Sequence, residues 1–328
     1  MLNIIDIAKM AGVSKSTVSR YLNGGYVSEE RKKKIKEIID ETGFVPQRQA
    51  KGLRNRKTNL IAVIVPKIST ETTSLVVDGI TSILNKEKYE VIIANTNLST
   101  KKEIEYLNVF KTNQVDGIIL IATTITKEHE KIFKEITVPF VIVAQEVDEF
   151  SCVFHDDYNA GKYCTQILLD RGRKNIAFVG VYEDDIAVGY NRQKGYMDTI
   201  CENSIAINKH YIKTGDFSHE SGYRLTKELM ELEERPDAIF AVTDTIAFGV
   251  ICYLNEAGIK IPEEVSVISI GDNRIANYMT PRLTTLHYFY FEAGEESATI
   301  LLDMLHKKNK IEVKKVKLGY KLIERASL

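Results

Sequence analysis

The hydrophobic pattern of the chain changes near residue 58. Before that point, apolar residues recur three or four positions apart in short stretches, which is typical of small amphipathic helices. Asn3 and Ser14 precede the first two stretches and are predicted N-caps, and Gly12 separates the two helices. A third helix is expected to follow Ser28 and to end at Gly43. Residues 1–57 are therefore predicted to form a small all-α head.

The rest of the chain alternates short apolar runs, which are predicted strands, with amphipathic segments, which are predicted helices. Such alternation indicates doubly wound parallel sheets covered by helices on both faces. The strands are too numerous for one simple sheet, so this α/β core is expected to have two subdomains and a ligand cleft at the strands' carboxyl ends. The predicted strands are Leu60–Val65, Glu90–Ala94, Gly117–Ile121, Phe140–Val143, Asn175–Val179, Ala238–Val242 and Val265–Ile270. The predicted helices include Leu75–Lys86, Lys101–Thr112, Gly161–Arg171, Ser221–Leu232 and Thr245–Ala257.

Composition narrows the class of protein. The 328 residues are 44% hydrophobic and 27% charged, with no apolar run long enough for a membrane helix and no secretory signal at the N-terminus. The four cysteines lack CxxC spacing and the six histidines lack metal-ligand spacing, so we expect free thiols and no metal or cofactor. No P-loop, GxSxG or HExxH pattern is present, which argues against an enzyme. A cytoplasmic globular protein is expected.

Charge is distributed unevenly between the two parts. Residues 1–57 carry 13 Lys and Arg against 6 Asp and Glu, whereas the remaining residues carry 31 against 39. A small basic head on a mildly acidic body is expected when only the head contacts a polyanion. The Arg31–Lys34 run supplies much of the excess, so a solvated charged surface is the alternative interpretation.

Residues 6–23 carry the most specific pattern in the chain. They predict a helix, a turn broken by glycine, and a second helix with polar residues at its N-terminal end, where a recognition helix meets base edges. This run resembles the helix-turn-helix of the lactose-repressor (LacI) family, D-[VI]-A-x-x-[AS]-G-V-S-x-x-T-V-S-R-x-L-N. The resemblance implies that Lys15, Ser16 and Arg20 face the bases. Thr17 and Ser19 suit phosphate oxygens, and Asn23 joins the same DNA-binding set.

The next segment, Gly43–Arg54, resembles the family's hinge, which we expect at about residues 46–56. In the family this segment becomes helical on the operator, and paired leucines from two subunits enter the minor groove. Leu53 matches that leucine, and Ala50 matches the small residue that lets the paired helices approach. Gln47, Lys51 and the helix-weakening Gly52 depart from the family pattern.

From Asn59 onward the chain resembles the family's regulatory core, whose fold is that of periplasmic sugar-binding proteins. We expect this core at 58–328, with an N-subdomain at about 58–157 and 286–316 and a C-subdomain at about 158–285 and 317–328. The end of the chain resembles the family's last strand. No leucine heptad follows, so a homodimer is expected rather than a tetramer.

Several core residues match effector-binding positions of the family. Arg192 matches an arginine whose guanidinium group can bind paired hydroxyls or an anion. Phe217 matches an aromatic residue that stacks on the ligand ring, and Tyr290 matches a second aromatic residue of the cleft. Gly271 stands where the family often has a carboxylate that grips sugar hydroxyls, which would suit an anionic ligand, and Lys67 is expected at the cleft mouth facing Arg192. The resemblance also nominates Gln145, Asp244 and Asp272, of which Asp244 could equally support the fold.

Within the family, the chain looks most similar to the repressors of sucrose and trehalose operons. We therefore expect a repressor of a carbohydrate operon that binds near-palindromic operator DNA and is released by a sugar or sugar phosphate. A family member that uses a corepressor is the first alternative. A sugar-binding protein of a transport system is the second, and the basic head argues against it.

Overall fold

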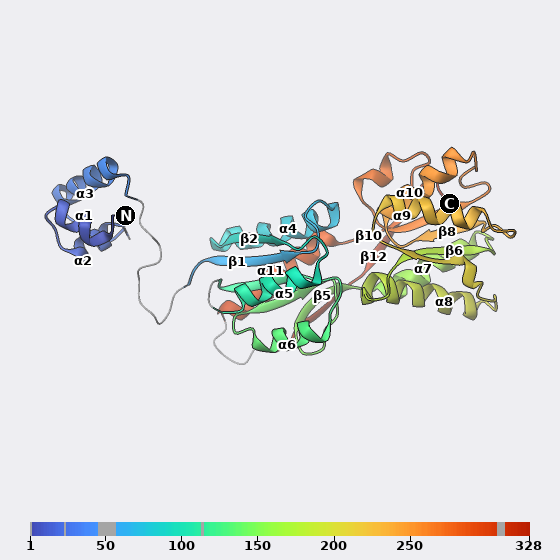
Figure 1. Ribbon diagram of the computed structural model, residues 1–328, viewed down its shortest axis with the longest axis horizontal. Coiled ribbons are helices and arrows are strands. Elements are labelled where there is room, and N and C mark those ends of the chain that lie inside the picture. The colour runs from blue at the N-terminus through green and yellow to red at the C-terminus, as the bar shows by residue number, and fades with distance from the viewer. Residues whose placement is uncertain (1, 23, 45–56, 113–114, 307–311) are drawn as a thin grey trace. The chain divides into compact units, whose positions relative to one another are not determined.

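The structure, a computed structural model, describes residues 2–22, 24–44, 57–112, 115–306 and 312–328. The chain divides into two compact units, residues 1–56 and 57–328 (Figure 1). This boundary lies next to the one that the change of hydrophobic pattern predicts. None of the helices in the described ranges is long and apolar enough to cross a membrane.

The head contains the predicted helices α1 (Ile4–Met10), α2 (Lys15–Leu22) and α3 (Glu29–Thr42). Asn3 caps α1, because its side chain accepts from the amide of Ile5 at 2.8 Å and Asp6 closes a capping box onto the Asn3 amide at 2.9 Å. Gly43 ends α3 with a φ of +60°, a left-handed conformation that favours glycine. The head has its own hydrophobic core, in which the fully buried residues are Ile7, Val18 and Ile35.

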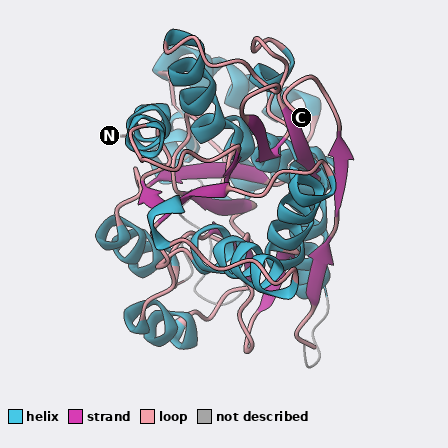
Figure 2. Cartoon of the chain, turned by 90° about the vertical axis from the view of Figure 1, so that its right-hand side faces the viewer, coloured by secondary structure: helices cyan, strands magenta, loops and turns pink. Residues whose placement is uncertain are grey.

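The second unit contains two lobes, each built on a six-stranded sheet (Figure 1), and helices surround the strands (Figure 2). The sheet of the N-terminal lobe has the order β11-β5-β4-β3-β1-β2, and all of its strand pairs are parallel. Its strands are β1 (Leu60–Val65), β2 (Glu90–Asn95), β3 (Gly117–Ile121), β4 (Phe140–Val143), β5 (Ser151–His155) and β11 (Lys315–Leu318). Its helices are α4 (Glu71–Leu84), the 3-10 turn η1 (Asn85–Glu87), α5 (Thr100–Phe110), α6 (Lys127–Glu135) and α11 (Tyr290–His306).

The sheet of the C-terminal lobe has the order β12-β10-β9-β8-β6-β7, and only β12 is antiparallel to its neighbour. Its strands are β6 (Ile176–Val181), β7 (Ile212–Gly215), β8 (Ala238–Ala241), β9 (Ser266–Gly271), β10 (Thr284–Tyr288) and β12 (Tyr320–Ile323). Its helices are α7 (Asp157–Asp170), the π-helix η2 (Ile186–Asn191), α8 (Arg192–Glu202), η3 (Lys209–Tyr211), α9 (His219–Met230), α10 (Asp244–Glu256) and η4 (Arg274–Asn277).

Side-chain alternation explains why the strands are covered on both faces. In β1, Ile61 and Val63 join the cluster under α4 and α11, whereas Ala62 and Ile64 join the cluster under α5 and α6. Both sets are fully buried, so β1 is an apolar run rather than an alternating one. Such burial is what a parallel sheet with helices on both faces requires, the arrangement that the alternation of predicted strands and helices indicated.

The chain crosses between the lobes after β5, after β10 and after β11. The predicted subdomain limits fall close to these crossings but need two corrections. Residues 286–288 belong to the C-terminal sheet, because Leu286 and Tyr288 pair with β12. Residues 317–318 belong to the N-terminal sheet, because Lys317 and Leu318 pair with β5.

Candidate functional site

Helix α2 presents the polar residues that the sequence assigned to DNA. Lys15, Ser16 and Arg20 are exposed, whereas Val18 on the other face is fully buried in the core of the head. Thr17 and Ser19 are half-buried at the edge of this surface. The Thr17 hydroxyl lies 2.8 Å from that of Ser14, which also caps α2 by accepting from the Thr17 amide. A buried apolar face and an exposed polar face therefore fix which side of α2 is available to a partner.

The turn after α2 adds a residue that the sequence analysis missed. Tyr26 is 91% exposed, an unusual state for an aromatic side chain, while the next residue, Val27, is buried in the head. The amide of Gly25 donates to the carbonyl of Arg20 at 2.8 Å, which holds this turn against the end of α2. The sequence feature that could have indicated this exposed residue is an aromatic side chain directly after a pair of glycines. Asn23, Ala50 and Leu53, together with the hinge segment 46–56, lie outside the described residues.

The second group of candidates lies where strands of the two lobes end. Arg192, the first residue of α8, is 3% exposed, and its Nε and Nη2 both lie 2.7 Å from Oδ1 of Asp157. Its Nη1 donates to the carbonyl of Val242, and its guanidinium carbon lies 5.1 Å from the ring centroid of Tyr288. The Tyr288 hydroxyl donates to the same Asp157 oxygen at 3.0 Å. The charge of Arg192 is thus balanced inside the protein.

Close helix packing holds Arg192 in this position. A Cβ on Gly161 of α7 would lie 2.4 Å from the carbonyl oxygen of Arg192, and one on Gly195 of α8 would lie 2.3 Å from the carbonyl oxygen of Tyr158. Only glycine fits at either point. The two glycines let α7 and α8 approach, and Asp157 and Arg192 at the starts of these helices meet.

His155, at the end of β5, links the two lobes through aromatic contacts. Its ring stacks on that of Tyr288 with centroids 4.2 Å apart and meets the ring of Tyr290 edge-on at 5.4 Å. Burial, with the positive charge of Arg192, lowers the pKa of His155 to about 3, so the imidazole is neutral near pH 7. Tyr290 is half-buried and packs against the cores of both lobes. The structure therefore brings Tyr290 and Arg192 into one cluster.

Gln145 forms a direct bridge between the lobes. It follows β4 in the N-terminal lobe, is 4% exposed, and donates from Nε2 to the carbonyl of Thr123 at 2.6 Å. The same nitrogen lies 3.0 Å from Oδ1 of Asp185, which follows β6 in the C-terminal lobe. Asp185 also caps η2 by accepting from the amide of Val188 at 3.0 Å. Burial raises the pKa of Asp185 to about 6.

Lys67 and Phe217 lie at the ends of β1 and β7. Lys67 is exposed and forms no ion pair with any described residue, and its charge contributes weakly to the electrostatics of Asp216 in the opposite lobe. Hydrogen bonds from Ser218 hold the pKa of Asp216 below its usual range, and the charges of Arg224 and, less strongly, Lys67 lower it further. Phe217 is half-buried against the core of the C-terminal lobe. The lobes are also joined by Glu71, whose carboxylate accepts from the amide of Arg274 at 3.1 Å.

Two predicted effector residues are engaged by partners within the C-terminal lobe. Asp244 is fully buried; one oxygen accepts from Ser269 at 2.5 Å and from Thr285 at 2.7 Å, and the other from the amide of Asn273 at 2.5 Å. It supports the loop after β9, as the sequence analysis allowed. Both oxygens of Asp272 are likewise engaged within the C-terminal lobe, one by His287 at 2.9 Å and the other by Arg325 at 2.6 Å.

Gly271 has a local explanation that replaces the one from the sequence. Its φ is +147°, and a Cβ at this position would lie 2.9 Å from Oδ2 of Asp244. Glycine is therefore required by the backbone and by the buried carboxylate beside it. Its presence gives no independent reason to expect an anionic ligand.

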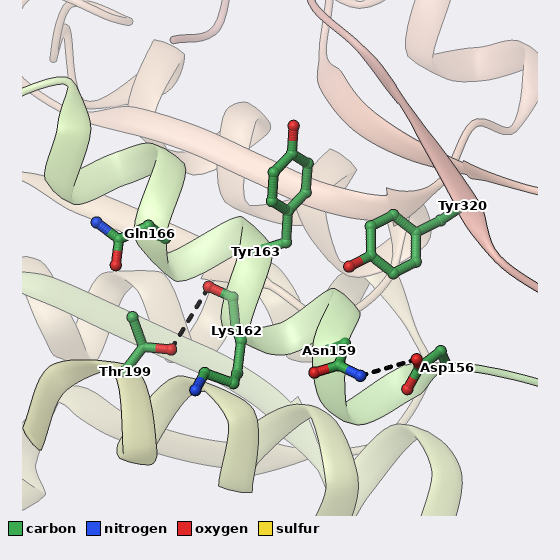
Figure 3. A pocket seen from close by; sticks show the side chains of 7 residues that line it. All are labelled: Asp156, Asn159, Lys162, Tyr163, Gln166, Thr199 and Tyr320. Atoms are coloured by element: carbon green, nitrogen blue, oxygen red, sulfur yellow. Dashed lines mark hydrogen bonds between the residues drawn. The ribbon is translucent and has the colours of Figure 1, made fainter. Parts of the chain in front are cut away.

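A further hollow lies between α7, α8 and β12 (Figure 3). Lys162, Tyr163, Gln166 and Tyr320 contribute to its lining, and none of the predicted effector residues does. The charge of Lys162 is offset by Glu202 at 2.6 Å. This hollow is therefore separate from the candidate site at the strand ends.

The helix-turn-helix head and the two-lobed α/β core together define a DNA-binding regulator with a ligand-binding core. Residues 3–47 match the model of the lacI family of bacterial regulatory proteins, and residues 165–328 match that of the periplasmic binding protein-like domain. The chain is 34% identical to the sucrose operon repressor of Staphylococcus xylosus, over 93% of this chain and 94% of that protein. It is 33% identical to the catabolite control protein A of Priestia megaterium, over 93% of each.

A solved structure of the transcriptional regulator CelR in complex with cellobiose covers all of both chains, with a TM-score of 0.77 and 25% identity. The chain belongs to the lacI family of transcriptional regulators, as the helix-turn-helix pattern predicted. The relatives are regulators, which confirms the prediction of a regulator rather than an enzyme.

Proposed function

We propose that this protein represses a carbohydrate-utilisation operon by binding a near-palindromic operator as a homodimer, and that a sugar in the cleft releases it. The observation that carries the DNA-binding half is the exposed polar face of α2, with Lys15, Ser16 and Arg20 on a head that has its own core. Arginine and lysine favour guanine acceptors in the major groove. The basic charge of the head supplies the phosphate attraction.

The edge of the N-terminal sheet supports the homodimer. Strand β2 is the outermost strand, and Ile92 and Ile93 on it are 39% and 40% exposed. An apolar edge strand left open favours association, and two copies of the chain would present two recognition helices to a near-palindromic site. Within that dimer, Leu53 and Ala50 are proposed to pair at the centre of the operator, as the family resemblance implies.

The cluster of side chains where the strands of the two lobes end supports the sugar effector. Aromatic rings, a paired arginine and polar side chains meet there from both lobes, which is the chemistry that holds a polyhydroxylated ring. Related proteins point the same way, since one represses a sucrose operon and another was solved with cellobiose. A ligand that contacts Gln145 and Arg192 together would draw the lobes into one arrangement, and only its differential affinity for that arrangement can drive release.

An operator-binding assay with two matched arginine variants tests this function. Arg20→Ala should weaken specific binding by about 10- to 100-fold and relax one base preference. Arg31→Ala removes the same charge from an exposed position on α3 and should weaken specific and non-specific DNA binding alike. If Arg20→Ala and Arg31→Ala had the same effect on both kinds of binding, α2 would contribute charge alone and the proposed role of Arg20 would be wrong.

A further inference from the structure

We propose that Asp185 determines effector specificity: together with Gln145 of the opposite lobe, it grips adjacent hydroxyl groups of an uncharged sugar and disfavours a phosphorylated one. This inference rests on the proposed function, because it names the chemical class of the effector. Asp185 is not among the residues that the family resemblance nominates.

The first step is the burial of two polar side chains that keep an open acceptor. Asp185 is 6% exposed and Gln145 is 4% exposed. Oδ1 of Asp185 accepts from Gln145 and Val188, while Oδ2 has no hydrogen-bond partner within the described part of the chain. The same is true of Oε1 of Gln145. Neither oxygen is among the fully buried side-chain atoms without a partner, so both stay accessible on side chains that are otherwise buried, and a ligand hydroxyl can donate to them.

The second step is the orientation of the amide. Nε2 of Gln145 donates to the carbonyl of Thr123 and to the carboxylate of Asp185, and both of these groups only accept. The amide nitrogen must therefore face them, and Oε1 must be the open atom. Oδ2 of Asp185 and Oε1 of Gln145 are thus two open acceptors on hydrogen-bonded side chains. They are complementary to two hydroxyl donors, such as those on neighbouring carbons of a sugar. The oxygens of a phosphate dianion are acceptors themselves and find no donor in this pair.

The third step is the charge around the pair. Arg192 is neutralised by Asp157 at 2.7 Å, whereas Lys67 is exposed to solvent and forms no ion pair with any described residue. These are the two cations that the sequence led us to expect as ligands of an anion. With Arg192 paired and the charge of Lys67 screened by solvent, the carboxylate of Asp185 leaves the site unfavourable for a phosphate ester. Asp185, in the loop after β6, also supplies a carboxylate, the group that the family often has at the position of Gly271.

Calorimetric titration of the full-length protein tests the proposal. The probes are sucrose, trehalose and cellobiose, with sucrose 6-phosphate and trehalose 6-phosphate as their charged counterparts. At least one uncharged sugar should bind at least 10-fold more tightly than its 6-phosphate. Asp185→Asn retains the ability to cap η2 through Oδ1, but its amide nitrogen then replaces the open Oδ2. An acceptor for the sugar hydroxyl becomes a donor, so binding of that sugar should weaken by about 10-fold or more. The same variant should also reduce the discrimination against the phosphate.

Asp184→Asn is the matched control, since it removes the same charge from the neighbouring exposed position. It should leave both affinities unchanged. Unaltered sugar binding by Asp185→Asn, or an equal loss in the two variants, would overturn the role of Asp185. Tighter binding of a 6-phosphate than of its parent sugar would overturn the uncharged class. If no probe binds, the role of Asp185 and the proposed sugar effector are both wrong. The proposed role of α2 in operator binding is tested separately, by the Arg20→Ala assay without ligand, and does not depend on this result.

Discussion

The ion pair between Arg192 and Asp157 allows a quantitative prediction about the stability of the core. Both side chains are at least 95% buried, and Arg192→Ala would leave the Asp157 carboxylate with the Tyr288 hydroxyl as its remaining side-chain partner. Leaving a buried charge uncompensated costs about 3–5 kcal/mol. Combining Arg192→Ala with Asp157→Asn should recover about 2 kcal/mol of the summed losses of the two single variants.

The nearby pair Lys162–Glu202 is a matched control for this double-mutant cycle. It joins the same two helices, but its side chains are 30% and 58% exposed, so its coupling should stay below about 1 kcal/mol. Urea unfolding followed by far-ultraviolet circular dichroism suits a chain that has no tryptophan. A loss below about 1 kcal/mol for Arg192→Ala, or a coupling no larger than that of the exposed pair, would refute the buried-charge reasoning.

Two further predictions concern buried carboxylates. Burial raises the pKa of Asp185 to about 6, so the folded core binds this proton more tightly than the unfolded chain and loses stability as the pH rises from about 4 to 6. Asp185→Asn should therefore raise the free energy of unfolding of the core at pH 7 by on the order of 2 kcal/mol and change it little near pH 4. Equal gains in the free energy of urea unfolding at both pH values would contradict this. Gly271→Ala should destabilise the core by about 2–4 kcal/mol, because its Cβ would meet the Asp244 carboxylate and the backbone φ is +147°. An unchanged melting temperature would show that the loop after β9 adapts.

Hydrophobic periodicity predicted strands well where they are apolar throughout. The bounds of β1, β3 and β4 agree with the prediction, since buried parallel strands are continuous apolar runs. Strands β5 and β10 were missed, because Ser151, Thr284 and Thr285 interrupt their apolar pattern. These residues are buried, and tertiary partners satisfy their polar groups: the hydroxyl of Ser151 accepts from the amide of Lys314, and that of Thr285 donates to Asp244.

The acidic triplet at 183–185 shows the same limit for the candidate site. In the sequence, Glu183, Asp184 and Asp185 form a charged run that is typical of a solvated loop. In the structure, Asp184 is exposed while Asp185 is buried and bonded to the opposite lobe. The spacing of an N-cap, three residues before Val188, was the only local signal.

The sequence by itself determined the class of this protein, because a helix-turn-helix and a parallel α/β core depend on local spacing and on the apolar content of each segment. The partners of the charged groups were decided by the tertiary structure alone. Arg192 lies 35 residues from Asp157 and Gln145 lies 40 residues from Asp185 along the chain. Burial changes the free energy of each charge by far more than its sequence neighbours do, so these contacts, and the ligand that they favour, follow only from how the lobes fold together.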